Sequence, residues 1–179
     1  MVKAILLIAG SIPVILAILI AIPMITKPDI PFSALVPTDT IELEYTRLQL
    51  QKISFGVIDK VESQKTEILA IKNDGNVRYS LVDAGIPQAD QISTLPKENV
   101  TKLAALIKET GFMSIPTEPF PIKDNVTQNQ QFSLKITLNG KTKQMRWPEQ
   151  NATDQFIPPI ITLVGSDLDK IINNLENNN

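Results

Sequence analysis

The sequence predicts an α+β protein in which an antiparallel sheet of four or more strands carries two helices on one face, together with a single N-terminal transmembrane helix. Three observations lead to this prediction. An uncharged apolar run occupies residues 4–25, two pairs of strand-like segments flank short glycine-containing turns, and two later segments carry apolar residues at helical spacing. The order of these segments along the chain is hairpin, helix, hairpin, helix, that is, ββα-ββα.

The apolar run predicts a membrane anchor at residues 1–26. Residues 4–25 contain no charged side chain, and a helix of this length crosses a hydrocarbon core of about 30 Å at about 1.5 Å per residue. A cleaved signal peptide is the alternative, but its apolar region is usually about 7–15 residues long and ends in an A-x-A-like site, which this run lacks. We expect an uncleaved, single-pass signal-anchor in the cell membrane, with the bulk of the chain outside the cytoplasm.

Three segments follow the anchor. Residues 27–40 contain three prolines and predict a stiff, extended linker. Residues 41–176 are enough for one extracytoplasmic α+β domain, and residues 177–179 are all asparagine, which predicts a disordered tail. The repeated ββα order fits either a duplicated unit or coincidence, and the sequence leaves both readings open.

The domain is expected to begin with a strand. Apolar and polar residues alternate from Ile41 to Tyr45, so one face of this strand is buried. The alternation changes phase near Leu48, which indicates a bulge or a second short strand. The polar run from Asp59 to Lys65 then breaks the strand pattern.

Two β-hairpins are predicted by their turns. Residues 66–72 and 76–82 flank Asn-Asp-Gly, in which the glycine supplies a positive φ at no steric cost. Residues 132–138 alternate strictly between apolar and polar, and Asn-Gly, the preferred pair for a type I′ turn, leads back into residues 141–147. Each hairpin precedes a predicted helix.

The two helices are predicted by apolar spacing and by their end signals. Residues 97–110 carry apolar side chains at i, i+3, i+4 and i+7; Thr94 is the expected N-cap, and Gly111 is expected to end the helix. The second helix begins at Pro158-Pro159 and carries its apolar stripe as far as Leu175. We expect both stripes to face the sheet.

Four local features together resemble a family of small secreted or membrane-anchored α+β domains. They are a D-G-x-V-x-Y hairpin at Asp74–Tyr79, a helix that ends in Gly111-Phe112, an N-G-K hairpin at Asn139–Lys141 and a final helix that starts at Pro158-Pro159. The family is similar in character to archaeal surface proteins. The resemblance covers residues 66–175 and implies an α+β fold in an extracytoplasmic setting; it implies no activity and no catalytic residues.

Composition excludes several classes of function. The formal net charge is −2, so the chain lacks the basic footprint of a nucleic-acid-binding protein. It has no cysteine, which excludes disulfides and catalytic thiols, and no histidine, which excludes Ser-His-Asp catalysis and imidazole-bound zinc or copper. We therefore assign no catalytic residue, no metal ligand and no cofactor.

With cysteine and histidine absent, an active site or a cation site would have to be built from carboxylates. Asp124, Asn125 and Thr127 offer oxygen ligands for calcium, and the alternative is a solvated loop, since the regular acidic spacing of a calcium loop is missing. A carboxylate-based hydrolase or a cation-binding enzyme is thus the alternative to a binding domain.

Sequons and one aromatic residue are the remaining candidate sites. N-glycosylation sequons occur at Asn99, Asn125 and Asn151, of which the last two fall in predicted loops, and their use requires the outward orientation. Trp147, the only tryptophan, is a candidate partner contact at the end of a strand; the alternative is a packing residue.

The leading functional hypothesis is a non-enzymatic, membrane-anchored extracytoplasmic domain that binds a partner. The expected partners are the lipid bilayer and another membrane or surface protein, in the manner of an accessory subunit of a membrane complex, and not nucleic acid. The alternatives are the carboxylate enzyme and a cleaved, secreted domain.

Overall fold

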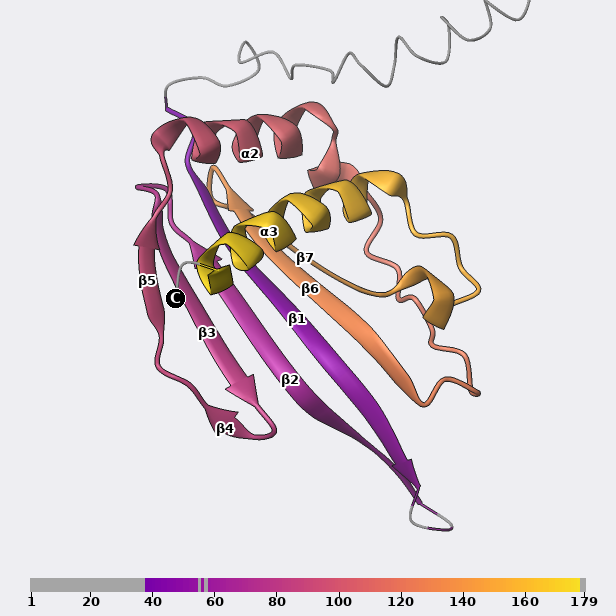
Figure 1. Cartoon of the computed structure of the whole chain (residues 1–179). Coiled ribbons are helices and arrows are strands. Elements are labelled where there is room, and N and C mark those ends of the chain that lie inside the picture. The colour runs from indigo at the N-terminus through magenta and orange to yellow at the C-terminus, as the bar shows by residue number, and fades with distance from the viewer. Residues whose placement is uncertain (1–37, 55, 57, 178–179) are drawn as a thin grey trace, which may run out of the picture. The chain divides into compact units, whose positions relative to one another are not determined.

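A computed structural model describes residues 38–54, 56 and 58–177 of the chain (Figure 1). The predicted anchor and residues 27–37 of the predicted linker lie outside the described residues, as do residues 178–179 of the predicted tail. Asn177, which the sequence assigns to the tail, is the last residue of a helix. Neither of the helices in the described part of the chain is long and apolar enough to cross a membrane.

An antiparallel sheet with two helices confirms the α+β prediction. The strands are β1 (Ile41–Ser54), β2 (Asp59–Ile71), β3 (Asn76–Asp83), β4 (Ile86–Pro87), β5 (Gln91–Thr94), β6 (Gln128–Leu138) and β7 (Lys141–Pro148). They are arranged in the order β4-β3-β2-β1-β6-β7, and β5 pairs with β3. Both predicted hairpins, β2–β3 and β6–β7, are present, and β1 lies between them.

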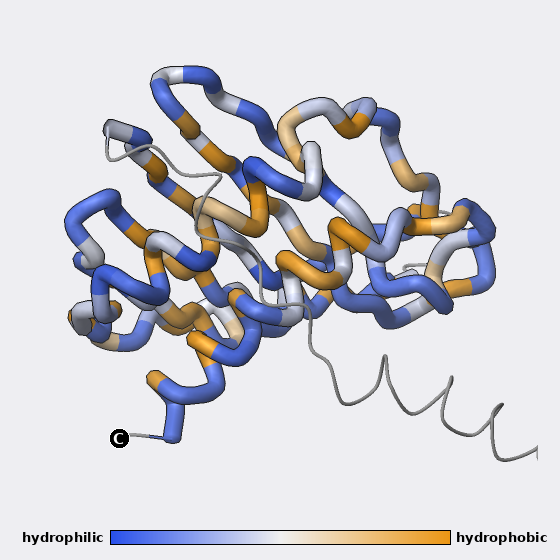
Figure 2. The backbone as a smooth tube through the Cα atoms, turned by 90° about the horizontal axis from the view of Figure 1, so that it is seen from above, coloured by the Kyte–Doolittle hydropathy of each residue, from blue (hydrophilic) through white to orange (hydrophobic). Residues whose placement is uncertain are grey.

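The two helices, α2 (Lys97–Glu109) and α3 (Pro159–Asn177), cover the same face of the sheet (Figure 1). Gly111 ends α2 with a φ of 66°, as predicted, whereas the N-cap is Pro96 and not Thr94, which belongs to β5. The core lies between the helices and the strand residues that face them. The alternation of apolar and polar residues along the strands can be followed in Figure 2. Its fully buried side chains include Tyr45, Leu69, Ile71, Val77, Tyr79, Ile107, Leu134, Ile136, Ile161, Leu168 and Ile172.

The polar run from Asp59 to Lys65 is the first half of β2, although its composition breaks the strand pattern. Backbone pairing with β1 holds it. Gln49 and Leu50 of β1 pair with Lys65 and Ser63, so Gln64 is an extra residue on β2. The predicted bulge is therefore present, but on β2 instead of β1. The Ser63 hydroxyl donates to the Lys65 carbonyl at 3.1 Å across it.

The β2–β3 turn depends on Gly75. Its φ is 87°, and its N–H donates to the Lys72 carbonyl at 2.9 Å, which closes the turn. Its carbonyl accepts the N–H of Leu95, just before α2, at 2.8 Å. A Cβ at this position would lie 2.6 Å from the Leu95 carbonyl oxygen, so the close approach of the two backbones requires glycine.

The β6–β7 turn is of a different kind. Asn139 and Gly140 both have positive φ, 50° and 77°, as the type I′ prediction requires. The two hairpins thus have turns of different length, three residues against two. The duplication of a ββα unit stays a prediction, and the turns do not support it.

Replacing Gly75 with alanine is expected to lower the free energy of unfolding by about 2–4 kcal/mol, because both the positive φ and the contact with Leu95 disfavour a Cβ. Gly85→Ala is the matched control: its φ is 80°, but nothing lies within 4 Å of the added Cβ, so a loss of only about 1 kcal/mol is expected. Urea unfolding followed by the fluorescence of Trp147 measures both. Equal losses of unfolding free energy in the two variants would show that the close approach of Gly75 to Leu95 is not what requires glycine.

Candidate functional site

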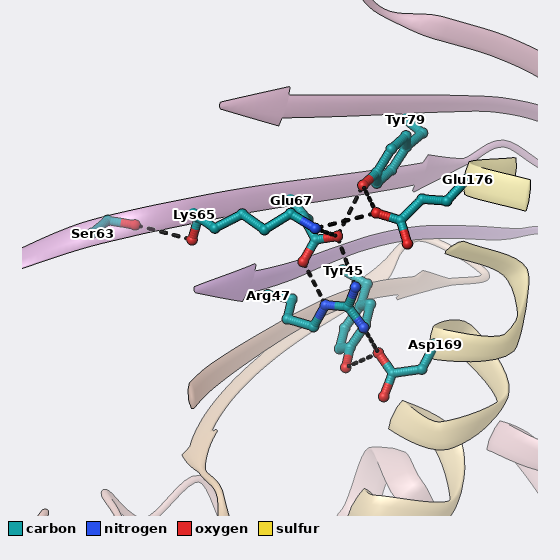
Figure 3. Close-up of polar contacts among 8 residues, drawn as sticks. All are labelled: Tyr45, Arg47, Ser63, Lys65, Glu67, Tyr79, Asp169 and Glu176. Atoms are coloured by element: carbon teal, nitrogen blue, oxygen red, sulfur yellow. Dashed lines mark hydrogen bonds and ion pairs between the residues drawn. The ribbon is translucent and has the colours of Figure 1, made fainter. Parts of the chain in front are cut away.

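Seven polar side chains from β1, β2, β3 and α3 meet where the C-terminal half of α3 lies over the sheet (Figure 3). Alternation along the strands turns them toward the helix, and the two from α3 are seven residues apart, on one side of the helix. We call this group the polar cluster. Its members are Tyr45, Arg47, Lys65, Glu67, Tyr79, Asp169 and Glu176.

Glu67 is the most buried charged member of the polar cluster, with an exposed fraction of 3%. Its carboxylate forms a bidentate ion pair with Arg47, in which Nε lies 2.6 Å from Oε2 and Nη2 lies 2.7 Å from Oε1. The Tyr79 hydroxyl donates to Oε1 at 2.9 Å, and Lys65 Nζ lies 3.1 Å from the same oxygen. Both carboxylate oxygens therefore have donors.

These donors keep Glu67 ionised. Burial acts to raise the pKa of Glu67, but the hydrogen bonds from Arg47, Tyr79 and Lys65 outweigh it and lower the pKa to about 2. The hydrogen bond to Glu67 in turn raises the pKa of Arg47. The pair is thus a fixed charge pair at neutral pH.

Asp169 joins α3 to the same arginine. Its Oδ1 accepts a hydrogen bond from the Tyr45 hydroxyl at 3.0 Å and lies 3.4 Å from Arg47 Nη1. Burial raises the pKa of Asp169, and the contacts with Tyr45 and Arg47 offset this only in part. The pKa values of Glu67 and Asp169 are therefore shifted in opposite directions on the two sides of one guanidinium group.

Glu176 makes the second contact between α3 and the sheet. Its Oε1 lies 3.0 Å from the Tyr79 hydroxyl and 3.2 Å from Lys65 Nζ. Burial acts to lower the pKa of Lys65, but its hydrogen bonds to Glu67 and Glu176 raise it overall. Tyr79 and Lys65 thus bridge a strand carboxylate and a helix carboxylate, which holds two like charges close together.

Oppositely shifted carboxylates are typical of acid–base pairs in enzymes. Here, however, both carboxylates are bound by donors of the protein itself. A surface hollow of about 630 Å³ lies elsewhere, lined by residues 121–125 and Asp154. The polar cluster therefore acts, in this geometry, to position α3 on the sheet.

Two of the three candidate calcium ligands, Asp124 and Asn125, line that hollow, and Thr127 does not. Asp124 and Asn125 are exposed in a turn, and the neighbouring Lys123 has its Nζ 3.1 Å from an Asp154 carboxylate oxygen. This lysine places a positive charge beside the oxygen ligands that a cation would need. Within the described residues, no group of three or more acidic side chains is arranged to hold a metal ion.

The three sequon asparagines are all exposed. Asn99 lies in the first turn of α2, Asn125 in the turn near the surface hollow, and Asn151 in the short 3₁₀ helix η3 (Gln150–Ala152). The structure therefore presents each of them to solvent, including Asn99, which the sequence places at the start of a helix.

Trp147 is not available as a partner contact, because it lies in the core with an exposed fraction of 4%. Its ring is 5.7 Å from that of Phe132 and 6.4 Å from that of Tyr45, centroid to centroid. A Cβ on Gly165 of α3 would lie 3.3 Å from it. The packing role, which the sequence left as the alternative, is the one that the structure shows.

Sequence reasoning missed the polar cluster, although a signal for it exists. Lys65 and Glu67 occupy the same strand face as Leu69 and Ile71, and Arg47 follows the alternation that buries Tyr45. Opposite charges at inward positions of two neighbouring strands indicate a buried ion pair.

No protein-family model matches the chain, and no curated protein sequence matches it. The resemblance to small anchored or secreted α+β domains stays a prediction.

Replacing Arg47 with methionine is expected to lower the free energy of unfolding at pH 7 by about 3–5 kcal/mol, because Glu67 then remains buried without its main partner. Arg78→Met on the exposed face of β3 is the matched control and should change stability by less than about 0.5 kcal/mol. Urea unfolding at pH 7 measures both. A loss in Arg47→Met no larger than that in the control would show that the ion pair does not hold the site.

Stability should fall between about pH 4.5 and pH 2 because of Glu67. Its pKa is about 2 in the folded state and 4.5 ordinarily, so its contribution is fully present above pH 4.5 and is lost as the pH falls through 2. The expected loss is up to about 3 kcal/mol. Urea unfolding as a function of pH should show that Glu67→Gln, which is less stable than the parent at pH 6, approaches it at pH 2. Parallel pH profiles for the two proteins would contradict the assignment.

Proposed function

We propose that the protein is a single-pass, membrane-anchored extracytoplasmic domain that binds another membrane or surface protein through the helix-free face of its sheet. The observation that carries the proposal is the contrast between the two faces. The helix side is filled by the core and by the polar cluster, whereas the opposite face carries aliphatic side chains that no helix covers in the described part of the chain (Figure 1).

Three aliphatic residues on neighbouring strands form this patch. They are Leu48 on β1, Ile68 on β2 and Val82 on β3, each partly exposed. Thr66 of β2 pairs with both Leu48 and Val82, and Ile68 is two residues further along the same strand face, so the three are neighbours. We call them the outer-face patch.

Charged residues lie next to the outer-face patch on the same face. Glu44 of β1 pairs with Lys135 of β6 on one side and with Ala70 of β2 on the other, and Ala70 pairs with Arg78 of β3. An apolar centre with a charged rim is the usual arrangement of a protein-binding surface. The hollow on this face, between Glu44, Ala70 and Lys135, is only about 180 Å³, so the face suits a protein partner better than a small molecule.

The carboxylate enzyme is the second candidate function, and the opposite pKa shifts of Glu67 and Asp169 are the observation that favours it. It would require a substrate to displace donors such as Tyr45 and Arg47 from these carboxylates. That requirement makes the binding domain the better supported proposal.

The membrane setting rests on the uncharged run at residues 4–25. Intact mass measurement of the full chain, purified from native membranes in mild detergent, tests it. An uncleaved N-terminus would support the anchor, and glycan mass at Asn125 or Asn151 would support the outward orientation. A chain shortened beyond about residue 22 would favour the cleaved, secreted alternative.

Replacing Ile68 with lysine is expected to remove a stoichiometric companion protein from the purified full chain, because a buried, unpaired charge at the centre of an interface typically costs 2 kcal/mol or more, about thirtyfold in affinity. Leu163→Lys on α3, where leucine is 48% exposed, is the matched control and should retain the companion. Native mass spectrometry measures the complex. Loss in both variants, or in neither, would contradict binding through the outer-face patch.

A further inference from the structure

The first five residues of β2 form an open strand edge. β1 pairs with β2 along its whole length, but β3 pairs with it only from Lys65 to Ile71. The last backbone hydrogen bond on that side runs from the Ala84 N–H to the Gln64 carbonyl at 2.7 Å. In the described part of the chain, no strand pairs with residues 59–63 on this side, and β1 and β2 extend past β3 and β4 as a ribbon, which β6 accompanies along β1 as far as Gln51 (Figure 1).

We propose that this edge pairs with the same edge of a second copy of the chain, antiparallel and centred on Val61. The contact goes beyond the proposed function, because it uses the edge of β2 and not the outer-face patch. An unpaired row of N–H and C=O groups is the usual template for the addition of a strand.

Symmetry restricts how two such edges can pair. In a continuous sheet with a two-fold axis perpendicular to it, each residue lies opposite a residue of the same face in the other copy. With Val61 on the axis, Lys60 of each copy lies opposite Glu62 of the other, and the two Val61 side chains meet on the other face. The pairing therefore includes two opposite-charge pairs and one apolar pair.

The neighbouring registers are disfavoured by charge. Centring the pairing on Lys60 places two lysines opposite each other, and centring it on Asp59 or Glu62 places two carboxylates opposite each other. Centring it on Ser63 would use Gln64, whose carbonyl is already bonded to Ala84. The charges thus select a single register.

The side chains required by this register are accessible. Val61 is 60% exposed, and the side chains of Lys60 and Glu62 are 63% and 38% exposed. Lys60 Nζ lies 2.7 Å from Glu62 Oε1 within one chain, which places both charges on the same side of the strand. In the dimer, Lys60 and Glu62 of the two copies would form a group of four charges in which each positive charge has negative neighbours.

A lysine and a bulge often protect an edge strand against pairing. Here the bulge at Gln64 lies where the pairing with β3 ends, and Glu62 offers each lysine a partner in the second copy. The charges then specify the register instead of preventing the contact. The contact area of five residues is small, so we expect weak association in solution, strengthened where both copies are tethered to one membrane.

Disulfide trapping tests the contact, since the chain has no cysteine of its own. Directly opposite residues of antiparallel strands have Cα atoms about 4.5–5.5 Å apart, which fits a disulfide. The full-length Val61→Cys variant in detergent or lipid vesicles should therefore form a covalent dimer under mild oxidation. Ile92→Cys on β5, where isoleucine is 71% exposed, is the matched control and should form at least about tenfold less. Equal trapping of the two variants would overturn the proposal.

Charge reversal in the Val61→Cys background tests the register. Lys60→Glu and Glu62→Lys each place like charges opposite each other, so each variant alone should lose roughly tenfold in trapping. A mixture of the two, distinguished by mass, should form the mixed dimer, because glutamate at position 60 of one chain then faces lysine at position 62 of the other. The register would be overturned if the charge reversals did not change the yield of covalent dimer. It would also be overturned if the mixture formed no more mixed dimer than either variant alone forms homodimer.

Ile68→Lys in the Val61→Cys background should leave the yield of covalent dimer unchanged, which separates this contact from the proposed outer-face partner.

Discussion

The bidentate ion pair between Arg47 and Glu67 is the interaction on which the position of α3 depends. A buried ion pair is by itself weak evidence of stability, since desolvation offsets much of its attraction. Its effect here is geometric. Arg47 also contacts Asp169, and Glu67 shares Tyr79 and Lys65 with Glu176. The helix is therefore attached at two points two turns apart, which fixes both its rotation and its position along its axis.

Aromatic packing and this polar attachment meet in one side chain. The ring of Tyr45 packs against those of Phe132 and Trp147, which also contact each other, while its hydroxyl donates to Asp169. A Cβ added to Gly165 would lie 3.3 Å from the Trp147 ring and 3.7 Å from the Tyr45 hydroxyl, so α3 approaches the sheet closely at this point. Burial and Asp169 both raise the pKa of Tyr45, which therefore remains a neutral donor. The apolar core and the charged contacts thus define the same placement of the helix.

Local signals in the sequence predict the parts of the fold that local chemistry determines. Glycine with positive φ fixes both hairpin turns and the end of α2, and apolar spacing identifies the two helices. The polar cluster could not be found in this way, because its residues are up to 131 positions apart, from Tyr45 to Glu176, and their contact depends on how α3 lies on the sheet. The burial of Trp147 likewise depends on that packing.

The first half of β2 shows why a strand can lack a sequence signal altogether. Apolar alternation appears in a strand because one face is covered, as it is from Glu67 to Ile71 under the helices. The bulge at Gln64 is where the strand leaves the pairing with β3, and the β1–β2 ribbon beyond it has polar residues on both faces. Where no layer of the described residues covers the strand, alternation brings no gain from burial, and backbone pairing with β1 maintains the strand. Because β3 does not continue alongside this segment, its outer backbone groups are open to another strand in the described part of the chain, so the segment with the weakest strand signal is also one that can pair between molecules.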